Sequence, residues 1–188
     1  SFSNMTSVGS YFFRLTVTDN QGAIDQDDIQ VVVTAAANVA PVVTDATIDP
    51  EPINANGTAT YSIALTARDA NGGTDIASQY SIINYPGGPY RGYIGWSTRS
   101  FPFFGGTTNS VACTGGGTAA KNASGYGDQY INLISCSTSV TGDYRTTTLV
   151  VSFNSNFTTP TTNNTVSTWA ADSIDAYSGW SPFDTFDL

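Results

Sequence analysis

The sequence predicts an all-β protein organised as a β-sandwich. Apolar and polar residues alternate with a period of two along most of the chain, as in half-buried strands, and no helical stripe interrupts them. Only 11% of the residues are charged, compared with about 25% in ordinary soluble domains, and Thr, Ser, Asn and Gly fill the polar positions. The 18 glycines and 8 prolines are turn signals between many short strands, which favours a sandwich.

The expected strands follow in order along the chain. The first ends at Asp19 and places four apolar side chains on one face: Tyr11, Phe13, Leu15 and Val17. A second strand gathers Tyr61, Ile63, Leu65 and Ala67 in the same way, and a third, YRTTTLVVSF, gathers Leu149, Val151 and Phe153. Further strands are predicted at 29–34, 42–48, 76–84, 91–96, 129–136, 165–171 and 177–186.

One strand–turn–strand unit recurs three times, as LTVTDNQGAID, LTARDANGGTD and TWAADSIDAYS. In each copy an aspartate ends the strand: Asp19, Asp69 and Asp172. Aspartate accepts hydrogen bonds from the backbone of its own turn, and glycine supplies positive φ. We therefore interpret the repeat as a turn-building unit and not as a catalytic motif.

The stretch AAANVAP at residues 35–41 separates two strand-rich regions. Its small residues and its proline are typical of a short linker, which we assign to 37–41. The expected organisation is a strand hairpin over 1–36 and a sandwich over 42–188. Because two strands alone bury too little surface to be stable in water, we expect the hairpin to pair with another chain or domain.

The composition excludes several classes of function. The formal charge is −9 with 6 basic residues, so no basic patch exists for nucleic acid or anionic lipid. No apolar run approaches the ~20 residues of a membrane span, so membrane insertion is not expected. The chain has no histidine, which removes the usual general base and every Ser-His-Asp arrangement. Carboxylate pairs remain for acid–base chemistry, but nearly all aspartates lie in turns, and we expect no enzyme.

Cys113 and Cys136 are the only two cysteines. In an oxidising compartment they form a disulfide, and the alternative is two buried free thiols. A bridge that closes a loop of this size contributes roughly 3 kcal/mol in the chain-entropy model. The glycine-rich stretch CTGGGTAAKNASGYGDQY lacks the G-K-[ST] of a phosphate-binding loop. We interpret it as a flexible loop that the bridge pins to the strand carrying Cys136.

The acidic turns offer one candidate cofactor site, for calcium. Asp69, Asn71 and Asp75 have the spacing D-x-N-x-x-x-D, and Asp19 with Asp25 makes a thinner version. Calcium binds about six to eight hard oxygen ligands, and neighbouring turn carboxylates supply several of them. The alternative is that these residues only build the turn. No other cofactor is expected.

Aromatic residues are dense between residues 83 and 104. The candidates for ligand or partner contact are Tyr85, Tyr90, Trp96, Phe101, Phe103 and Phe104. Exposed rings would stack on sugars, and an exposed apolar patch would dock a protein. The alternative is that the rings of this segment lie in the core of the sandwich.

Several residues near the start of the chain carry a family resemblance: Gly9, Tyr11, LTVTD at 15–19, Gly22, Ala23, Asp27, Asp28 and VVV at 31–33. With them, residues 9–43 resemble the closing half of a PKD-type (polycystic-kidney-disease-type) immunoglobulin-like domain. Residues 165–186 resemble the last hairpin of bacterial immunoglobulin-like surface modules. The resemblance implies immunoglobulin-like folds and a secreted or surface-exposed prokaryotic protein. The opening half of the PKD-type domain is not present in this sequence, so we expect either that the chain is a fragment of a longer one or that the hairpin completes a sheet elsewhere.

These observations favour a non-catalytic structural subunit of an extracellular fibre, surface layer or adhesive array. Its partner would be another copy of the chain or a neighbouring immunoglobulin-like domain, joined by strand addition. The interface candidates are Tyr11, Phe12, Phe13, Leu15 and Val17. The alternative is a carbohydrate-binding or spacer module accessory to a secreted hydrolase, with a polysaccharide as its partner.

Overall fold

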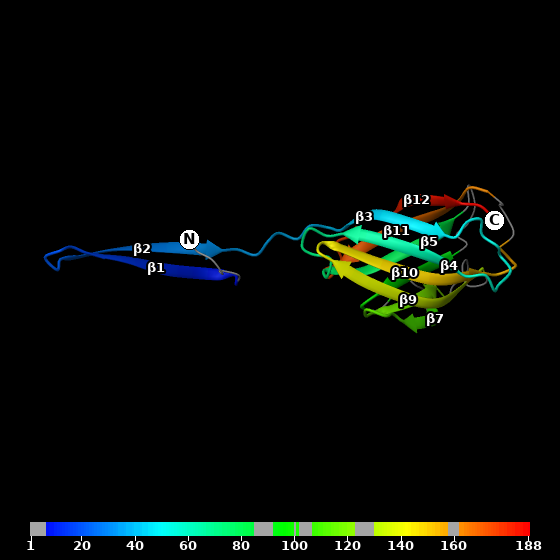
Figure 1. Cartoon of the computed structure of the whole chain (residues 1–188), viewed down its shortest axis with the longest axis horizontal. Helices are drawn as coiled ribbons and strands as arrows, with labels where there is room; N and C mark the ends of the chain where they lie inside the picture. Colours follow the sequence, from blue (N-terminus) through cyan, green and yellow to red (C-terminus); the bar gives the residue numbers. More distant parts are fainter. Residues whose placement is uncertain (1–6, 85–91, 100, 102–106, 123–129, 158–161) are drawn as a thin grey trace. The chain divides into compact units, whose positions relative to one another are not determined.

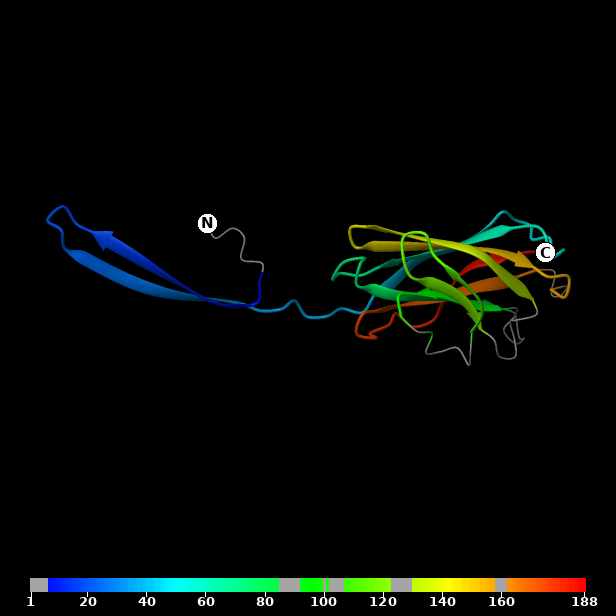
Figure 2. The ribbon, with the colours of Figure 1, turned by 90° about the horizontal axis from the view of Figure 1, so that it is seen from below.

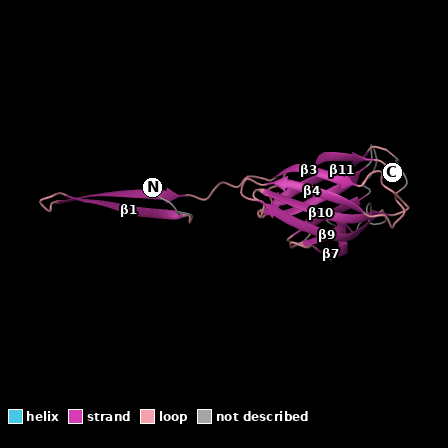
Figure 3. Ribbon diagram, viewed as in Figure 1, coloured by secondary structure: helices cyan, strands magenta, loops and turns pink. Residues whose placement is uncertain are grey.

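The structure is a computed structural model, and it describes residues 7–84, 92–99, 101, 107–122, 130–157 and 162–188. The chain divides into two compact units, Ser1–Asn38 and Val39–Leu188, each of which is described by itself. Every regular element in the described residues is a β-strand (Figure 3), which confirms the all-β prediction. No helix with the length and apolarity of a membrane span occurs in these residues.

The first unit is an antiparallel hairpin of β1 (Gly9–Thr18) and β2 (Ile24–Val33), drawn in blue in Figure 1. Its register pairs Phe13 with Ile29 and Leu15 with Asp27. The sequence predicts a strand from residue 29, whereas β2 begins at Ile24 and includes the acidic stretch DQDD. The acidic residues are tolerated because both strands are exposed and Asp28 forms an ion pair with Arg14 on β1.

The second unit consists of two antiparallel sheets (Figure 2). The four-stranded sheet has the order β3-β4-β10-β9, with the strands β3 (Val42–Asp49), β4 (Tyr61–Arg68), β9 (Ile131–Thr141) and β10 (Tyr144–Phe153). The six-stranded sheet has the order β12-β11-β5-β6-β8-β7. Its strands are β5 (Ile76–Asn84), β6 (Gly92–Ser97), β7 (Thr107–Ala112), β8 (Thr118–Asn122), β11 (Asn164–Asp172) and β12 (Ser181–Phe186).

The main core joins side chains from both sheets. The predicted alternation is confirmed on β4, where the buried side chains are Tyr61, Ile63, Leu65 and Ala67. On β10, Leu149 belongs to the same cluster as Ile94 on β6 and Val166 on β11, so the two sheets pack face to face. Each large apolar side chain that is buried contributes about 1.5–3 kcal/mol. We expect a core of this size to be enough for the second unit to fold by itself.

The segment 113–130 departs from its prediction as a flexible loop. Strand β8 lies within it and pairs with β6 and β7. Ala119, Ala120 and Lys121 are all buried, and the Lys121 ammonium donates a hydrogen bond of 2.7 Å to the carbonyl of Ile131. A strand that is buried on both faces has no period of two, so periodicity cannot reveal it.

Candidate functional site

Two of the three repeated turns have the same hydrogen bonds. Asp19 Oδ1 accepts the backbone N–H groups of Gln21 and Ala23, each at 2.8 Å. Asp172 Oδ1 accepts those of Ile174 and Ala176, each at 2.9 Å. In both turns one carboxylate oxygen therefore stabilises the turn by accepting two of its backbone N–H groups. The interpretation of the repeat as a turn-building unit is confirmed for these copies.

The middle copy is different. Asp69 Oδ1 accepts the N–H of Asn71 at 2.7 Å, whereas the N–H of Gly73 donates to the carbonyl of Gly142. The Asp69 side chain is fully buried. Burial raises the pKa of Asp69, the hydrogen bond from Asn71 opposes this rise, and the nearby carboxylates of Asp75, Asp172 and Asp143 add to it.

Three carboxylates meet at this middle turn. Asp69, Asp75 and Asp172 each place one oxygen within 4.8 Å of the others. Asp75 Oδ1 also accepts a hydrogen bond from the Ser173 hydroxyl. The predicted calcium residues Asp69 and Asp75 are therefore together, and the carboxamide oxygen of Asn71 accepts the N–H of Val39 at 2.8 Å.

Sequence reasoning missed Asp172 as a member of this cluster. It lies about a hundred residues beyond the other two, at the end of β11, so spacing along the chain gives no indication of it. The repeat could have indicated Asp172, because Asp69 and Asp172 each end a strand in a copy of the same repeated unit. The antiparallel pairing of β11 with β5 then brings Asp172 opposite Ile76, next to Asp75.

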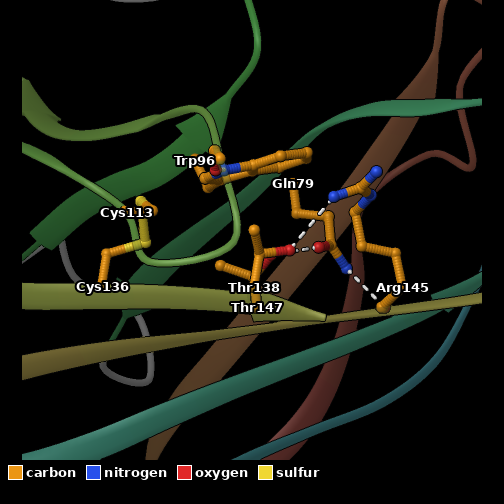
Figure 4. The surroundings of a disulfide bond; sticks show 8 residues. Gln79, Trp96, Cys113, Cys136, Thr138, Arg145 and Thr147 are labelled. Atoms are coloured by element: carbon orange, nitrogen blue, oxygen red, sulfur yellow. Dashed lines mark hydrogen bonds between the residues drawn. A yellow bond between two sulfur atoms is a disulfide. The ribbon is translucent and has the colours of Figure 1, made fainter. Parts of the chain in front are cut away.

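Cys113 and Cys136 form a disulfide, as predicted, with an S–S distance of 2.07 Å (Figure 4). The bridge connects the turn after β7 in one sheet to β9 in the other. Backbone hydrogen bonds support the same connection, since Thr114 donates to the carbonyl of Cys136 and Thr138 donates to that of Thr114. The two sheets are therefore joined both covalently and by hydrogen bonds beside the bridge.

The three successive glycines after Cys113 allow a close backbone approach. A Cβ on Gly115 would lie 2.0 Å from the carbonyl oxygen of Thr138, and one on Gly117 would lie 2.3 Å from Nε1 of Trp96. The indole N–H of Trp96 donates to the carbonyl of Gly116 at 2.9 Å. The glycines thus fit against a tryptophan and a strand, and the stretch is a packed turn.

A buried arginine completes these surroundings (Figure 4). The guanidinium of Arg145 lies 4.5 Å from the ring centroid of Trp96, and it donates to the carbonyl of Gly73 and to the hydroxyl of Thr138. Burial lowers the pKa of Arg145 from its ordinary value. Next to it, Gln79 accepts a hydrogen bond from Thr147 across the two sheets at 2.6 Å. These groups are structural, because they are enclosed between the sheets.

The proposed ligand-contact role of Trp96 is wrong. The residue lies on β6 with its ring fully buried, because the indole stacks on Arg145 and covers the glycine turn. Phe101 is half-buried and packs edge-to-face on Tyr80, with ring centroids 6.2 Å apart. The remaining candidates, Tyr85, Tyr90, Phe103 and Phe104, lie outside the described residues.

A different set of aromatic side chains forms a recess on the second unit. Tyr93, Trp169, Tyr177 and Trp180, together with Gly179, line a cavity of about 240 Å³, which we call the aromatic recess. Trp169 is buried and stacks on Tyr80, whereas Tyr177 and Trp180 are 66% and 44% exposed. Trp180 packs edge-to-face on Trp169 and on Tyr93 with centroid distances of 5.8 Å. The sequence signal was the aromatic content of the third repeat and the residues after it.

The hairpin of the first unit presents an apolar face. Antiparallel pairing and the period of two place Tyr11, Phe13, Leu15, Val17, Ile29 and Val31 on one face, where Asp27 and Asp25 lie opposite Leu15 and Val17. The other face carries the bidentate ion pair of Arg14 with Asp28, at 2.7 and 2.8 Å, and one ring, Phe12. Phe12, Leu15 and Val17 are 73%, 65% and 56% exposed. The predicted interface residues therefore occupy both faces, and the larger apolar group lies on one of them.

Comparison with known proteins gives a family match to the first unit. Residues 1–33 match the family model described as K319L-like, PKD domain. This match confirms the predicted PKD-type resemblance and is consistent with a partial PKD-type segment. PKD domains are typically extracellular and non-catalytic, so the match indicates an extracellular immunoglobulin-like module. No curated protein and no solved structure gives a significant match to the chain.

Proposed function

We propose that the chain is a non-catalytic structural subunit of a prokaryotic extracellular fibre, surface layer or adhesive array. The hairpin β1–β2 is its joint, and the partner is a sheet of a second copy of the chain. The observation that carries this proposal is the solvent-exposed apolar face of the hairpin. The extracellular character of PKD domains and the disulfide are consistent with such a location.

Burial of the apolar face would contribute to the free energy of association. Leu15 and Val17 are more than half exposed, and so is Ile29 on the neighbouring strand. Burying each of these side chains completely contributes about 1.5–3 kcal/mol. Burial of three such side chains, together with the half-buried rings of Tyr11 and Phe13, would offset a substantial part of the free-energy cost of the entropy lost on association.

The hairpin edges supply the second contribution. Within the described residues β1 and β2 pair only with each other, so each strand keeps one edge for further backbone hydrogen bonds. Strand β9 ends the four-stranded sheet, and it exposes Ile134 and Val140. Thr114 already forms backbone hydrogen bonds with this edge at Cys136 and Thr138, so a second copy offers the end of β9 beyond Thr138, with Val140 beside it, for strand addition.

The test is the association state of the full chain in solution. Light scattering after size exclusion should show concentration-dependent association, and L15D should abolish it by placing a charge on the apolar face. The matched control is T18D, which adds the same charge on the opposite face near the turn. Melting of the second unit should be the same in both variants. A monomeric wild-type chain, or undiminished association of L15D, would contradict the proposal.

The aromatic recess supports a second candidate function, polysaccharide binding. Tyr177 and Trp180 expose ring surface beside a cavity with apolar walls, and flat exposed rings of this kind stack on sugar rings. The recess is a pocket for one or two rings of a polymer, so binding would be weak for a single sugar and stronger for a repeated array. In this case the chain is an accessory module of a secreted hydrolase.

Affinity electrophoresis in gels that contain soluble cellulose, xylan or chitin derivatives tests this second function. Retardation of the wild type that W180A removes would support binding at the recess. The control is Y144A, which removes another exposed ring, one that lies beside Arg68 and away from the recess. Equal mobility of wild type and W180A in every gel excludes the recess as a site for these polysaccharides.

A further inference from the structure

The carboxylate cluster of the second unit contains an oxygen whose environment the turn does not explain. Asp69 Oδ1 holds the turn through the N–H of Asn71. Asp69 Oδ2 is buried, and within the described residues no hydrogen-bond partner reaches it. A buried carboxylate oxygen without a partner is costly, because its desolvation is not compensated. The turn-building role of Asp69 therefore accounts for only one of its two oxygens.

The neighbouring charges make this cost larger. Asp75 and Asp172 each bring a carboxylate oxygen to within 4.8 Å of Asp69, and Asp172 is also fully buried. Like charges at such a distance in a protein interior repel strongly unless an opposite charge lies between them.

The described basic side chains around the cluster contact other groups. Arg99 donates to the backbone carbonyls of Asp172 and Ser173 and to the carboxylate of Asp175. Arg145 donates to the carbonyl of Gly73. Both arginines therefore lie close to the cluster, yet the hydrogen bonds described for them go to backbone oxygens, to the Thr138 hydroxyl and to a carboxylate outside the cluster. A small cation would balance the three carboxylates more directly.

We propose that Asp69, Asp75 and Asp172 bind one calcium ion, with Asp69 Oδ2 as a buried ligand. Calcium holds its oxygen ligands at about 2.3–2.6 Å, so two ligands on opposite sides of the ion are about 5 Å apart. The three carboxylates fit this range. Magnesium requires about 2.1 Å and a strict octahedron, so two ligands on opposite sides of it would be only about 4.2 Å apart. Asp75 is partly exposed and leaves a path for the ion and for water ligands.

The bound ion would connect the two sheets at one end of the sandwich. Asp69 follows β4 of the four-stranded sheet, while Asp172 ends β11 and Asp75 precedes β5 in the six-stranded sheet. Three chain segments would therefore share one ion. Asn71 lies in the same turn as Asp69 and accepts a hydrogen bond from the N–H of Val39, the first residue of the second unit. An ion that orders this turn would therefore also stabilise the contact with Val39.

Isothermal titration of the full chain with calcium chloride, after removal of divalent ions by a chelator, tests the proposal. We expect one calcium per chain, with a dissociation constant at or below the range of roughly 0.1–1 mM found for extracellular modules. Saturating calcium should raise the melting temperature by several degrees, because the ion binds only the folded chain. Magnesium should bind at least tenfold more weakly.

Two substitutions separate metal binding from turn building. D69N and D172N keep an oxygen that accepts the backbone N–H groups of the turn but remove one charge from the cluster. Both should weaken calcium binding at least tenfold, and D69N without calcium should melt no lower than the wild type. The control is D175N, in the same turn as Asp172, because Asp175 pairs with Arg99 outside the cluster. It should bind calcium like the wild type.

The opposite results are equally clear. A wild-type chain that shows neither heat of binding nor a change in melting temperature at about 10 mM calcium, well above the range for extracellular modules, overturns the proposal. A calcium response that survives in D69N does so too, because the ion would then bind elsewhere, for example at the acidic stretch of β2.

Discussion

Removing the disulfide should lower the free energy of unfolding of the second unit by about 3 kcal/mol. The bridge joins residues 23 positions apart, and closing a loop of this size reduces the entropy of the unfolded chain by an amount equivalent to roughly 3 kcal/mol at 25 °C. Cys113 and Cys136 are 8% and 6% exposed, and because alanine removes only one sulfur atom at each position, the void that it leaves is small. The loss should therefore come mainly from the unfolded state.

The fold itself should survive this change. The backbone hydrogen bonds between Thr114 and the strand β9 make the same connection as the bridge, and Trp96 still donates to Gly116. The main core is formed by residues from both sheets and does not depend on the sulfur atoms for most of its contacts. We expect a native circular dichroism spectrum and a cooperative transition at a lower temperature.

The assay is thermal and denaturant unfolding of the wild type and of the C113A/C136A double variant. For a domain of this size, about 3 kcal/mol corresponds to a decrease in melting temperature of roughly 6–12 °C. The wild type under a phosphine reductant should melt close to the double variant. A decrease of less than about 2 °C, or loss of cooperative unfolding, would refute the entropic argument.

Three further predictions concern single side chains. R145A should destabilise the second unit by about 3 kcal/mol because it removes a buried hydrogen-bonded cation, whereas R68A, which loses an exposed ion pair, should cost less than about 1 kcal/mol in urea unfolding. G117A should lower the melting temperature more than G116A, since both have positive φ but only Gly117 lies against other atoms. Hydrogen bonds from Ala23 and Gln21 lower the pKa of Asp19 below 3.8, so its support of the hairpin turn is present above pH 3.8 and is lost as the pH falls through the lowered pKa. A carbon-detected NMR titration of the Asp19 carboxyl group should show this lowered pKa, and a value at or above 3.8 would contradict it.

Period-two alternation predicted the parts of the fold in which one face of a strand is buried and the other is not. The strand expected around Tyr61 and the strand YRTTTLVVSF coincide with β4 and β10. The same reasoning did not predict β7 or β8. Strand β8 is buried on both faces and contains two alanines and a lysine, so it shows no alternation. Strand β12 begins later than predicted, at Ser181, after the turn that carries Tyr177 and Trp180.

The candidate sites were less accessible to sequence reasoning. Asp69 and Asp75 were identified because they are close in the chain, whereas Asp172 joins them only through the pairing of β11 with β5. For Trp96 the sequence left both a contact role and a core position open, because nothing in its neighbourhood predicts a buried arginine to stack on it. Alternation indicates which face a residue occupies, but it does not reveal which distant residue covers that face.

The placement of the basic residues bears on how the protein survives outside a cell. Trypsin-like proteases cut after lysine or arginine in chain that is locally unfolded, and the sequence has only 6 such residues. Lys121 and Arg145 lie inside the sandwich on paired strands, and Arg14 and Arg68 also lie on paired strands. Cleavage at these four positions requires a sheet to open first. The hydroxyl-rich composition, with few basic residues, thus leaves such proteases few accessible cleavage sites.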